Sequence, residues 1–244
     1  MKFFNIISVS GINSTNDHLR ELHKAAKLPE GTVILADFQH KGKGRGENSW
    51  YSGNGMNILM SILLFPKIKT EQFFFLTEMV SLALIEMLSE INIKAKIKWP
   101  NDIYVGDKKI GGILIENTLT SDIIESSIIG VGLNVNEEKF PDDLPNPVSI
   151  KNISGKDHNR EVLTDSLLEK LSDHFNSLLA GQTDSMHTKY NTHLFRKKQL
   201  SKFSINGIQF EATIYLVQKD GMIVLETTDG EQKQFAFGEL EMLI

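Results

Sequence analysis

The sequence contains no cysteine among its 244 residues. This absence excludes disulfides, thiolate metal sites and cysteine nucleophiles, and it suits a reducing cytoplasm. Also missing is any run of the roughly 20 apolar residues that a membrane-spanning helix needs. The longest candidate, residues 73–88, is interrupted by Thr77, Glu78 and Glu86, and residues 1–10 lack the features of a signal peptide. We therefore expect a cytoplasmic protein with no membrane partner.

The sequence also has no excess of basic residues. Its 26 Lys and Arg against 31 Asp and Glu give a formal net charge of −5 and a pI of about 5.8, so nothing in the overall charge predicts a nucleic-acid partner. A hydrophobic content of 41% and a charged content of 23% are ordinary globular values. The length allows one sizeable core with a small appendage, or two modest domains.

Hydrophobic periodicity in residues 1–195 predicts an α+β domain with a mixed, hairpin-rich β-sheet. An N-cap sequence at residues 14–17 predicts a helix that ends before Pro29 and Gly31. Apolar residues at helical spacing predict further helices over 71–91 and 160–179. A break at Gly181, Thr183 and Asp184 precedes a short helix over 190–195. The predicted strands are residues 3–9, 32–38, 56–64, 95–98, 103–105, 110–117 and 128–135.

The last fifty residues change character. They alternate apolar and polar residues in four short runs, and Asn-Gly or Asp-Gly turns separate most of them. The runs are residues 203–205, 208–217, 222–226 and 232–237. Short strands at this spacing predict a small β-barrel. We therefore expect two domains, residues 1–195 and residues 196–244.

Residues 41–50, called here the glycine-basic loop, begin with three glycines and three cations in six positions. Glycines let backbone N–H groups approach an anion, and an arginine offers a planar fork to its oxygens. The spacing fits neither a dinucleotide fingerprint nor a P-loop, and such a loop alone is more often a solvated surface segment than a phosphate site. If it binds phosphate, we expect it to close over the ligand. Trp50, at its far end, is either an aromatic face for a purine or a core residue.

Three further segments are unusual for their positions. Residues 98–102, Lys-Trp-Pro-Asn-Asp, form either a stiff turn that presents two polar side chains or simply a turn. Residues 108–116 place two lysines before a glycine pair in a strand, and residues 130–136 place glycines and an asparagine in another. Glycines inside strands indicate close approach by a ligand or by another backbone. Each segment alone is more often structural, but their presence together favours a binding site.

In this order, the motifs resemble those of the biotin–protein ligases over nearly the whole chain. The matching segments are Ser14-Thr15-Asn16, Gln39 with GKGRGENSW, KWPND, KKIGGILIE and GVGLNVN. The resemblance implies a catalytic domain related to class II tRNA synthetases, followed by a small β-barrel. It also implies an enzyme that uses ATP and Mg²⁺ to convert biotin into biotinyl-5′-adenylate. The biotinyl group then passes to a lysine of a biotin carboxyl carrier protein.

The resemblance also implies roles for individual residues. Lys109 and Arg45 are the expected catalytic residues, Lys109 as the cation beside the carboxylate and α-phosphate and Arg45 to retain the adenylate. Asp102 is the expected metal ligand. The expected biotin-binding residues are Ser14, Thr15, Asn16, Gln39, Lys43, Gly44, Arg45, Lys109, Gly111 and Gly112. The expected ATP-binding residues are Lys43, Arg45, Trp50, Asn101, Lys109 and Asn134.

The sequence departs from the family pattern in two places. Family loops often carry arginine at the position of Lys43 and basic residues at those of Glu47 and Asn48, so we expect looser adenylate retention here. Family members that also act as repressors carry an N-terminal helix-turn-helix domain, whereas this chain begins at the first catalytic strand. Together with the acidic charge balance, this predicts no DNA binding.

Two alternatives to a biotin–protein ligase have less support in the sequence. A lipoate or octanoate ligase or transferase would carry an arginine-glycine motif that is absent, and KWPND favours biotin. A non-catalytic biotin or nucleotide sensor would not need both Lys109 and Arg45 beside a phosphate-type loop. The sequence leaves open a homodimer formed through an exposed sheet edge.

Overall fold

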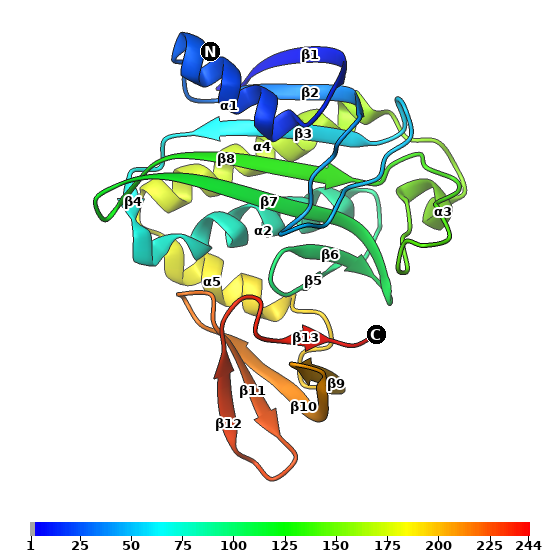
Figure 1. Cartoon of the computed structure of the whole chain (residues 1–244), viewed down its shortest axis with the longest axis vertical. Helices are drawn as coiled ribbons and strands as arrows, with labels where there is room; N and C mark the ends of the chain where they lie inside the picture. Colours follow the sequence, from blue (N-terminus) through cyan, green and yellow to red (C-terminus); the bar gives the residue numbers. More distant parts are fainter. Residues whose placement is uncertain (1–2) are drawn as a thin grey trace.

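The computed structural model describes residues 3–244 and contains two β-sheets of unequal size (Figure 1). The large sheet has the strand order β1-β2-β3-β8-β7-β6-β5, and β4 pairs with β8. Only β1 and β2 are parallel, so the expected mixed sheet within an α+β fold is confirmed. Its strands are β1 (Asn5–Ile12), β2 (Thr32–Gln39), β3 (Ile58–Leu64), β4 (Ile68–Lys69), β5 (Lys96–Lys98), β6 (Asp102–Val105), β7 (Lys108–Thr120) and β8 (Ile123–Leu133).

The helices cover the two faces of the large sheet unequally. On one face lies α2, with α4 and α5 packed against it, and α1 lies on the other (Figure 1). The helices are α1 (Thr15–Ala26), the 3₁₀ turn η1 (Thr70–Gln72), α2 (Phe74–Glu90), α3 (Ile150–Ser154), α4 (Arg160–Leu179) and α5 (Thr183–Thr192). Leaving one face only partly covered keeps part of β7 and β8 available for a ligand site.

The helix α2 is apolar almost all round because it lies between the large sheet and α4 and α5. Within residues 3–244, the segment Thr70–Glu90 is the one helical stretch long and apolar enough to cross a membrane. However, 78% of its apolar window is buried inside the protein. Its hydrophobicity is therefore explained by its position in the core.

Glu86 connects α2 to both neighbouring helices. Its carboxylate lies 3.1 Å from His174 Nε2 on α4 and 2.5 Å from Lys189 Nζ on α5. Burial raises the pKa of Glu86, but the hydrogen bonds and charges of His174 and Lys189 outweigh it and bring the pKa down to about 2.

We expect Glu86→Gln to destabilise the fold by about 1 kcal/mol at neutral pH, after discounting for solvent screening. A lowered carboxylate pKa stabilises the folded state above the unfolded value near 4.5, and this contribution is lost as the pH falls toward 2. Urea unfolding of both proteins between pH 7 and pH 2.5 measures the difference. The difference in unfolding free energy should shrink below pH 4.5. A difference that does not change with pH would contradict the stabilising role of the Glu86 carboxylate.

The C-terminal sheet contains five antiparallel strands in the order β12-β11-β10-β9-β13. They are β9 (Leu200–Ile205), β10 (Ile208–Val217), β11 (Ile223–Thr227), β12 (Gln232–Phe235) and β13 (Glu241–Met242). The expected small β-domain is present. Within residues 200–242 no pairing joins β12 to β13, which have only four and two residues, so the sheet is open rather than a closed barrel.

The connection between the sheets differs from the sequence prediction. Helix α5 begins at Thr183 and ends at Thr192, so the predicted helix over 190–195 is displaced toward the N-terminus. Gly181, with φ of 72°, accounts for the break before α5. Asp184 lies in the first turn of α5, where its negative charge interacts favourably with the positive end of the helix dipole. Phe195 N–H then donates to Ile97 O of the large sheet. The domain boundary expected after residue 195 stays a prediction.

Candidate active site

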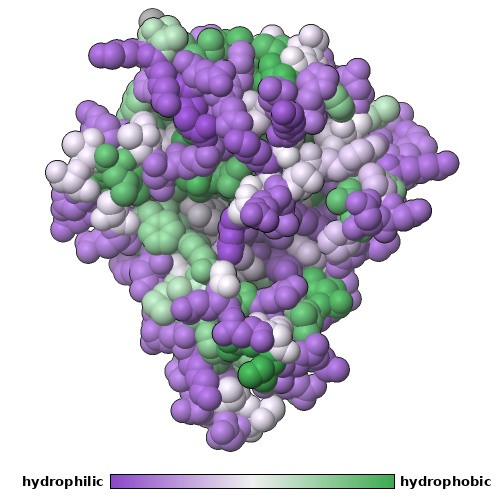
Figure 2. Space-filling model, viewed as in Figure 1, coloured by the Kyte–Doolittle hydropathy of each residue, from purple (hydrophilic) through white to green (hydrophobic). Residues whose placement is uncertain are grey.

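A cavity of about 610 Å³ lies on the face of the large sheet that carries α1. The space-filling view shows a hollow between the part of the molecule formed by the large sheet and the C-terminal sheet (Figure 2). Strands β7 and β8, the glycine-basic loop, residues 98–102, residues 140–147 and β13 contribute to its walls. The predicted site residues that line it are Ser14, Thr15, Asn16, Gln39, Lys43, Gly44, Arg45, Trp50, Asn101, Asp102, Lys109, Gly112 and Asn134.

Gly111 is the exception, and its predicted place beside biotin is wrong. A Cβ at Gly111 would meet the backbone oxygen of Gly132 and the side chains of Ile103 and Leu133, which belong to the core beneath the sheet. Successive residues of a strand face opposite sides of the sheet. Gly112 therefore faces the cavity, and Gly111 faces away from it.

One end of the cavity is a cluster of buried, uncharged polar groups at the start of α1. The backbone N–H and the hydroxyl of Thr15 both donate to Gln39 Oε1, at 2.8 and 3.0 Å. Ser61 Oγ lies 2.7 Å from Thr15 Oγ1 and 2.5 Å from Asn16 Oδ1. A Cβ at Gly130 would overlap the Asn16 amide, so this position requires glycine. Hydroxyls and amides at such density suit a neutral ligand with both donors and acceptors.

The glycine-basic loop is an ordered hairpin rather than an irregular segment. Gly44 N–H donates to Asn48 O at 2.7 Å, and Trp50 N–H donates to Gly42 O at 2.9 Å. A Cβ at Gly42 would collide with Trp50 O, so glycine is needed where the two arms of the hairpin meet. These backbone bonds hold Trp50 against the sheet.

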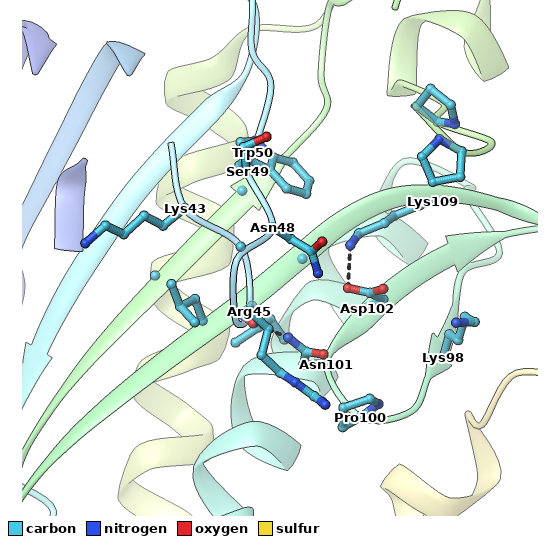
Figure 3. Close-up of a pocket in the computed structure, with 18 of the residues that line it drawn as sticks. Lys43, Arg45, Asn48, Ser49, Trp50, Lys98, Pro100, Asn101, Asp102 and Lys109 are labelled. Carbon is cyan, nitrogen blue, oxygen red and sulfur yellow. Dashed lines mark hydrogen bonds and ion pairs between the residues drawn. The ribbon is translucent and has the colours of Figure 1, made fainter. Parts of the chain in front are cut away.

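Lys43 does not point toward the predicted phosphate region. Its ammonium lies 2.6 Å from Asp17 Oδ2 at the start of α1, and Figure 3 shows it directed away from Lys109 and Asp102. Burial raises the pKa of Asp17, but its hydrogen bonds with Lys43 and Arg20 outweigh this effect and leave the pKa below its usual value. In this arrangement the cation of Lys43 fastens the loop to α1.

Arg45, at the tip of the loop, reaches the C-terminal part of the chain. Its guanidinium lies 5.7 Å from the centre of the Phe237 ring, within the range of a cation–π contact. Phe237 in turn packs on Trp99, with the ring centres 5.3 Å apart, and Trp99 Nε1 donates to Gly221 O at 2.9 Å. The loop and the C-terminal sheet therefore meet above the 98–102 turn.

Lys109 places a positive charge on the wall of the cavity. Its ammonium forms an ion pair of 2.7 Å with Asp102 Oδ1 and lies 5.6 Å from the centre of the Trp50 ring (Figure 3). Asn101 Nδ2 donates to Ile113 O at 2.6 Å, which fixes the turn that carries Asp102. A cation held beside a carboxylate and an aromatic ring is suited to stabilise a phosphate that enters the cavity.

At the part of the cavity lined by Trp50 and Asn134, two buried polar atoms have no hydrogen-bond partner within residues 3–244. They are Trp50 Nε1, a donor, and Asn134 Oδ1, an acceptor. Asn134 Nδ2 is already committed to Val148 O at 3.1 Å. A Cβ at Gly132 would lie 2.5 Å from the Trp50 ring, so glycine allows the indole to rest on the sheet. An unpaired donor and an unpaired acceptor in one cavity match the polar edge of a purine.

Comparison with known proteins places the chain in a family. The model of the Biotin/lipoate A/B protein ligase family matches residues 9–134. The bifunctional ligase/repressor BirA of Bacillus spizizenii is 30% identical over 230 residues, which cover 92% of this chain and 70% of the relative. The chain belongs to the biotin/lipoate A/B protein ligase family.

Two further proteins similar to this chain are named biotin protein ligases. The chloroplastic biotin–protein ligase 1 of Arabidopsis thaliana is 37% identical over 131 residues, covering 51% of this chain and 34% of the relative. The solved structure of the Aquifex aeolicus biotin protein ligase in complex with biotin and ATP has a TM-score of 0.82 and 27% identity, with 98% of each chain covered. The resemblance stated from the sequence is confirmed, and the lipoate alternative is not favoured.

The sequence prediction missed several residues of this site, among them Ser61, Lys98 and those of segment 140–147 that line the cavity. Ser61 joins the Thr15 and Asn16 cluster, and its signal was one hydroxyl inside the otherwise apolar strand β3. Lys98 lines the cavity from within the KWPND motif. Burial lowers the pKa of Lys98, the charge of Asp102 opposes that effect, and the charge of Lys109 adds to it.

Proposed function

We propose that biotin and ATP bind side by side in this cavity and react at the position faced by Lys109. The chain is an ATP-dependent biotin–protein ligase, because its relatives and structural neighbours are biotin ligases over nearly its full length. The observation that supports the residue assignments is the division of one cavity into an uncharged polar end, a central lysine and an unpaired donor–acceptor end.

In our proposal the ureido ring of biotin lies against Ser14, Thr15 and Asn16, with Gln39 holding Thr15 in place. The cluster presents hydroxyls and amides to a ligand that has both N–H groups and a carbonyl. This orientation directs the carboxylate of biotin along β7 toward Lys109. Glycine at position 112 lets the Trp50 ring lie close to β7, because a Cβ there would lie 3.1 Å from the indole.

ATP lies at the other end, with adenine against Trp50 and Asn134. A carboxylate oxygen of biotin attacks the α-phosphorus, the bond to the bridging oxygen of the β-phosphate breaks, and pyrophosphate leaves. The attack brings an anion to a polyanion, so the fixed cation of Lys109 lowers the barrier by stabilising the added charge. The loop residues Gly44 and Arg45 cover the adenylate and keep water from hydrolysing it.

We propose Asp102 as the protein ligand of a Mg²⁺ ion that is otherwise held by phosphate oxygens. Within residues 3–244 no group of three or more His, Asp or Glu side chains is arranged to hold a metal. One carboxylate is consistent with Mg²⁺, which commonly uses one or two carboxylates together with substrate phosphates. When bound, the ion would neutralise phosphate charge during adenylate formation.

The second step transfers the biotinyl group to a protein. The ε-amine of a carrier lysine attacks the acyl carbon of the adenylate, AMP leaves, and the nitrogen loses a proton to solvent. We propose a biotin carboxyl carrier protein as the acceptor and the cytoplasm as the location. We also propose that the exposed edge strand β1 allows a second copy of the chain to pair with the large sheet.

Mass spectrometry of a carrier domain incubated with the chain, ATP, Mg²⁺ and biotin tests the overall reaction. We expect the mass of one biotinyl group to be added to one lysine of the carrier. Parallel reactions with lipoate and octanoate, followed by ATP–pyrophosphate exchange, test the choice of acid. Exchange with lipoate or octanoate and none with biotin would overturn the assignment.

Two glycines of β8 provide a matched pair of variants. We expect Gly130→Ala to raise the KM for biotin by about tenfold or more, because its Cβ would displace Asn16. Gly132→Ala should instead raise the KM for ATP by a similar factor, because its Cβ would displace the Trp50 ring. Exchange kinetics with each substrate varied in turn measure both constants. Variants that raise both constants equally would argue against separate biotin and ATP ends.

A further inference from the structure

Glu137 is a buried carboxylate just outside the cavity. It follows β8, its residue is 8% exposed, and it makes no ion pair in the described part of the chain. Instead its Oε2 accepts hydrogen bonds from Gly53 N–H at 2.7 Å and from Asn57 Nδ2 at 3.1 Å. A buried charge without a counter-ion is costly unless it is fully hydrogen-bonded, so this position has a specific use.

Asn57 links Glu137 to both neighbouring segments, residues 52–57 and residues 135–137. It is fully buried, and its Oδ1 accepts from Val135 N–H at 2.9 Å while its Nδ2 also donates to Ser52 Oγ at 3.0 Å. Glu137 and Asn57 together therefore join residues 52–57 to residues 135–137. The two segments are about eighty positions apart in the sequence.

Each segment continues directly into a residue of the nucleotide end. Trp50 is two positions before Ser52, and Asn134 is next to Val135. Glu137 also contacts the segment that closes this end of the cavity, because Ser149 Oγ donates to Glu137 O at 2.5 Å. The network that arranges the biotin end, around Thr15 and Ser61, shares no residue with it.

We propose that Glu137 is a positioning residue that sets the distance between Trp50 and Asn134 and thereby the affinity for the nucleotide. This inference rests on the proposed function, in which those two residues bind adenine. Glu137 does not line the cavity and so acts through the two segments. Without its carboxylate, Gly53 N–H and the Asn57 amide lose their acceptor, and the segments lose their common anchor. A binding group displaced by about 1 Å can lose a large part of its contribution to ligand affinity.

Biotin-dependent ATP–pyrophosphate exchange, with each substrate varied in turn, tests the proposal in Glu137→Leu and Glu137→Gln. We expect Glu137→Leu to raise the KM for ATP by about tenfold or more and to leave the KM for biotin within about twofold. Glu137→Gln keeps one side-chain oxygen that can accept both hydrogen bonds, so it should stay within about threefold of the natural protein for both substrates.

Glu78→Leu is the matched control. It removes another buried carboxylate, which lies on α2 outside the cavity and contacts His187 Nδ1 at 2.6 Å. It should leave the KM for ATP unchanged, whatever its effect on thermal unfolding. If Glu137→Leu does not fold, Gly53→Ala replaces it, because a Cβ there would lie 2.8 Å from Glu137 Oε2 and displace the same segment. Gly53→Ala should raise the KM for ATP and not that for biotin.

The outcomes distinguish a failure of the role of Glu137 from a failure of the proposed function. An unchanged KM for ATP in Glu137→Leu, or in Gly53→Ala where the first does not fold, would overturn the role of Glu137 alone. Equal losses for ATP and biotin, or an equal rise of the KM for ATP in Glu78→Leu, would do the same by indicating general destabilisation. Absence of exchange in the natural chain would overturn the proposed function together with this inference.

Discussion

Replacing Lys109 by alanine is expected to reduce biotin-dependent ATP–pyrophosphate exchange by roughly 10²–10³-fold, the usual cost of losing one preorganised charge-stabilising group. Lys109 lines the cavity with its ammonium between Asp102 and the Trp50 ring. Its removal also leaves the Asp102 carboxylate without its partner, facing the incoming phosphates. Both changes raise the energy of the transition state more than that of the bound substrates.

Lys108→Ala is the matched control for this variant. Lys108 is the preceding residue of β7, is exposed, and points away from the cavity because strand residues alternate. Its exchange rate should stay within about twofold of the natural protein, since exposed surface substitutions have small effects. Thermal unfolding of both variants separates catalysis from stability. An unchanged exchange rate in Lys109→Ala would show that the cation near the reacting phosphate is another group.

The second large effect is expected for Arg45→Gly. We expect this variant to form biotinyl-adenylate but to release it early, so that bystander lysines become biotinylated. Loss of one charge-assisted contact of about 1.5–3 kcal/mol corresponds to roughly tenfold to hundredfold faster escape. The glycine-basic loop can keep its backbone hydrogen bonds, because glycine retains the carbonyl at position 45 that accepts from Asn48 N–H at 3.2 Å.

Mass spectrometry of an unrelated, lysine-rich protein added to the reaction measures this release. Lys41→Gly, an exposed change in the same loop, is the control and should leave carrier specificity intact. Phe237→Ala removes the aromatic surface on which the guanidinium rests, so we expect it to increase bystander labelling by a smaller factor. Strict carrier specificity in Arg45→Gly would contradict the retention role.

Much of the site was predictable because its chemistry is concentrated in short motifs. The stretch containing Lys41, Gly42 and Lys43, the KWPND turn and the paired glycines of β7 and β8 are unusual for their local structure, and unusual residues in ordinary elements indicate ligand contact. The glycines show this best. Gly130 and Gly132 are required because Asn16 and Trp50 occupy the space that a Cβ would take.

The differences from the sequence prediction concern the direction in which a residue faces, not which residue types form the site. Gly111 was expected in the cavity, yet the pairing of Gly111 with Leu133 and of Gly112 with Gly132 places only Gly112 on that face. Lys43 lines the cavity, but its ammonium pairs with Asp17, a residue of another element, and does not turn toward Lys109 and Asp102. Neither outcome follows from local sequence, because strand register and ion-pair choice depend on distant residues.

The sequence by itself determined which chemical groups are present, their order, and the local conformations that glycine, proline and apolar periodicity impose. From these follow the α+β fold, the motif resemblance to the ligase family, and a set of expected site residues of which all but Gly111 line the cavity. Tertiary structure decided which groups meet: Ser61 with Thr15, Arg45 with Phe237, and Glu137 with Gly53. The reason is physical, since backbone preferences act over a few residues. The position of a side chain relative to a ligand depends on sheet register and packing across the whole chain.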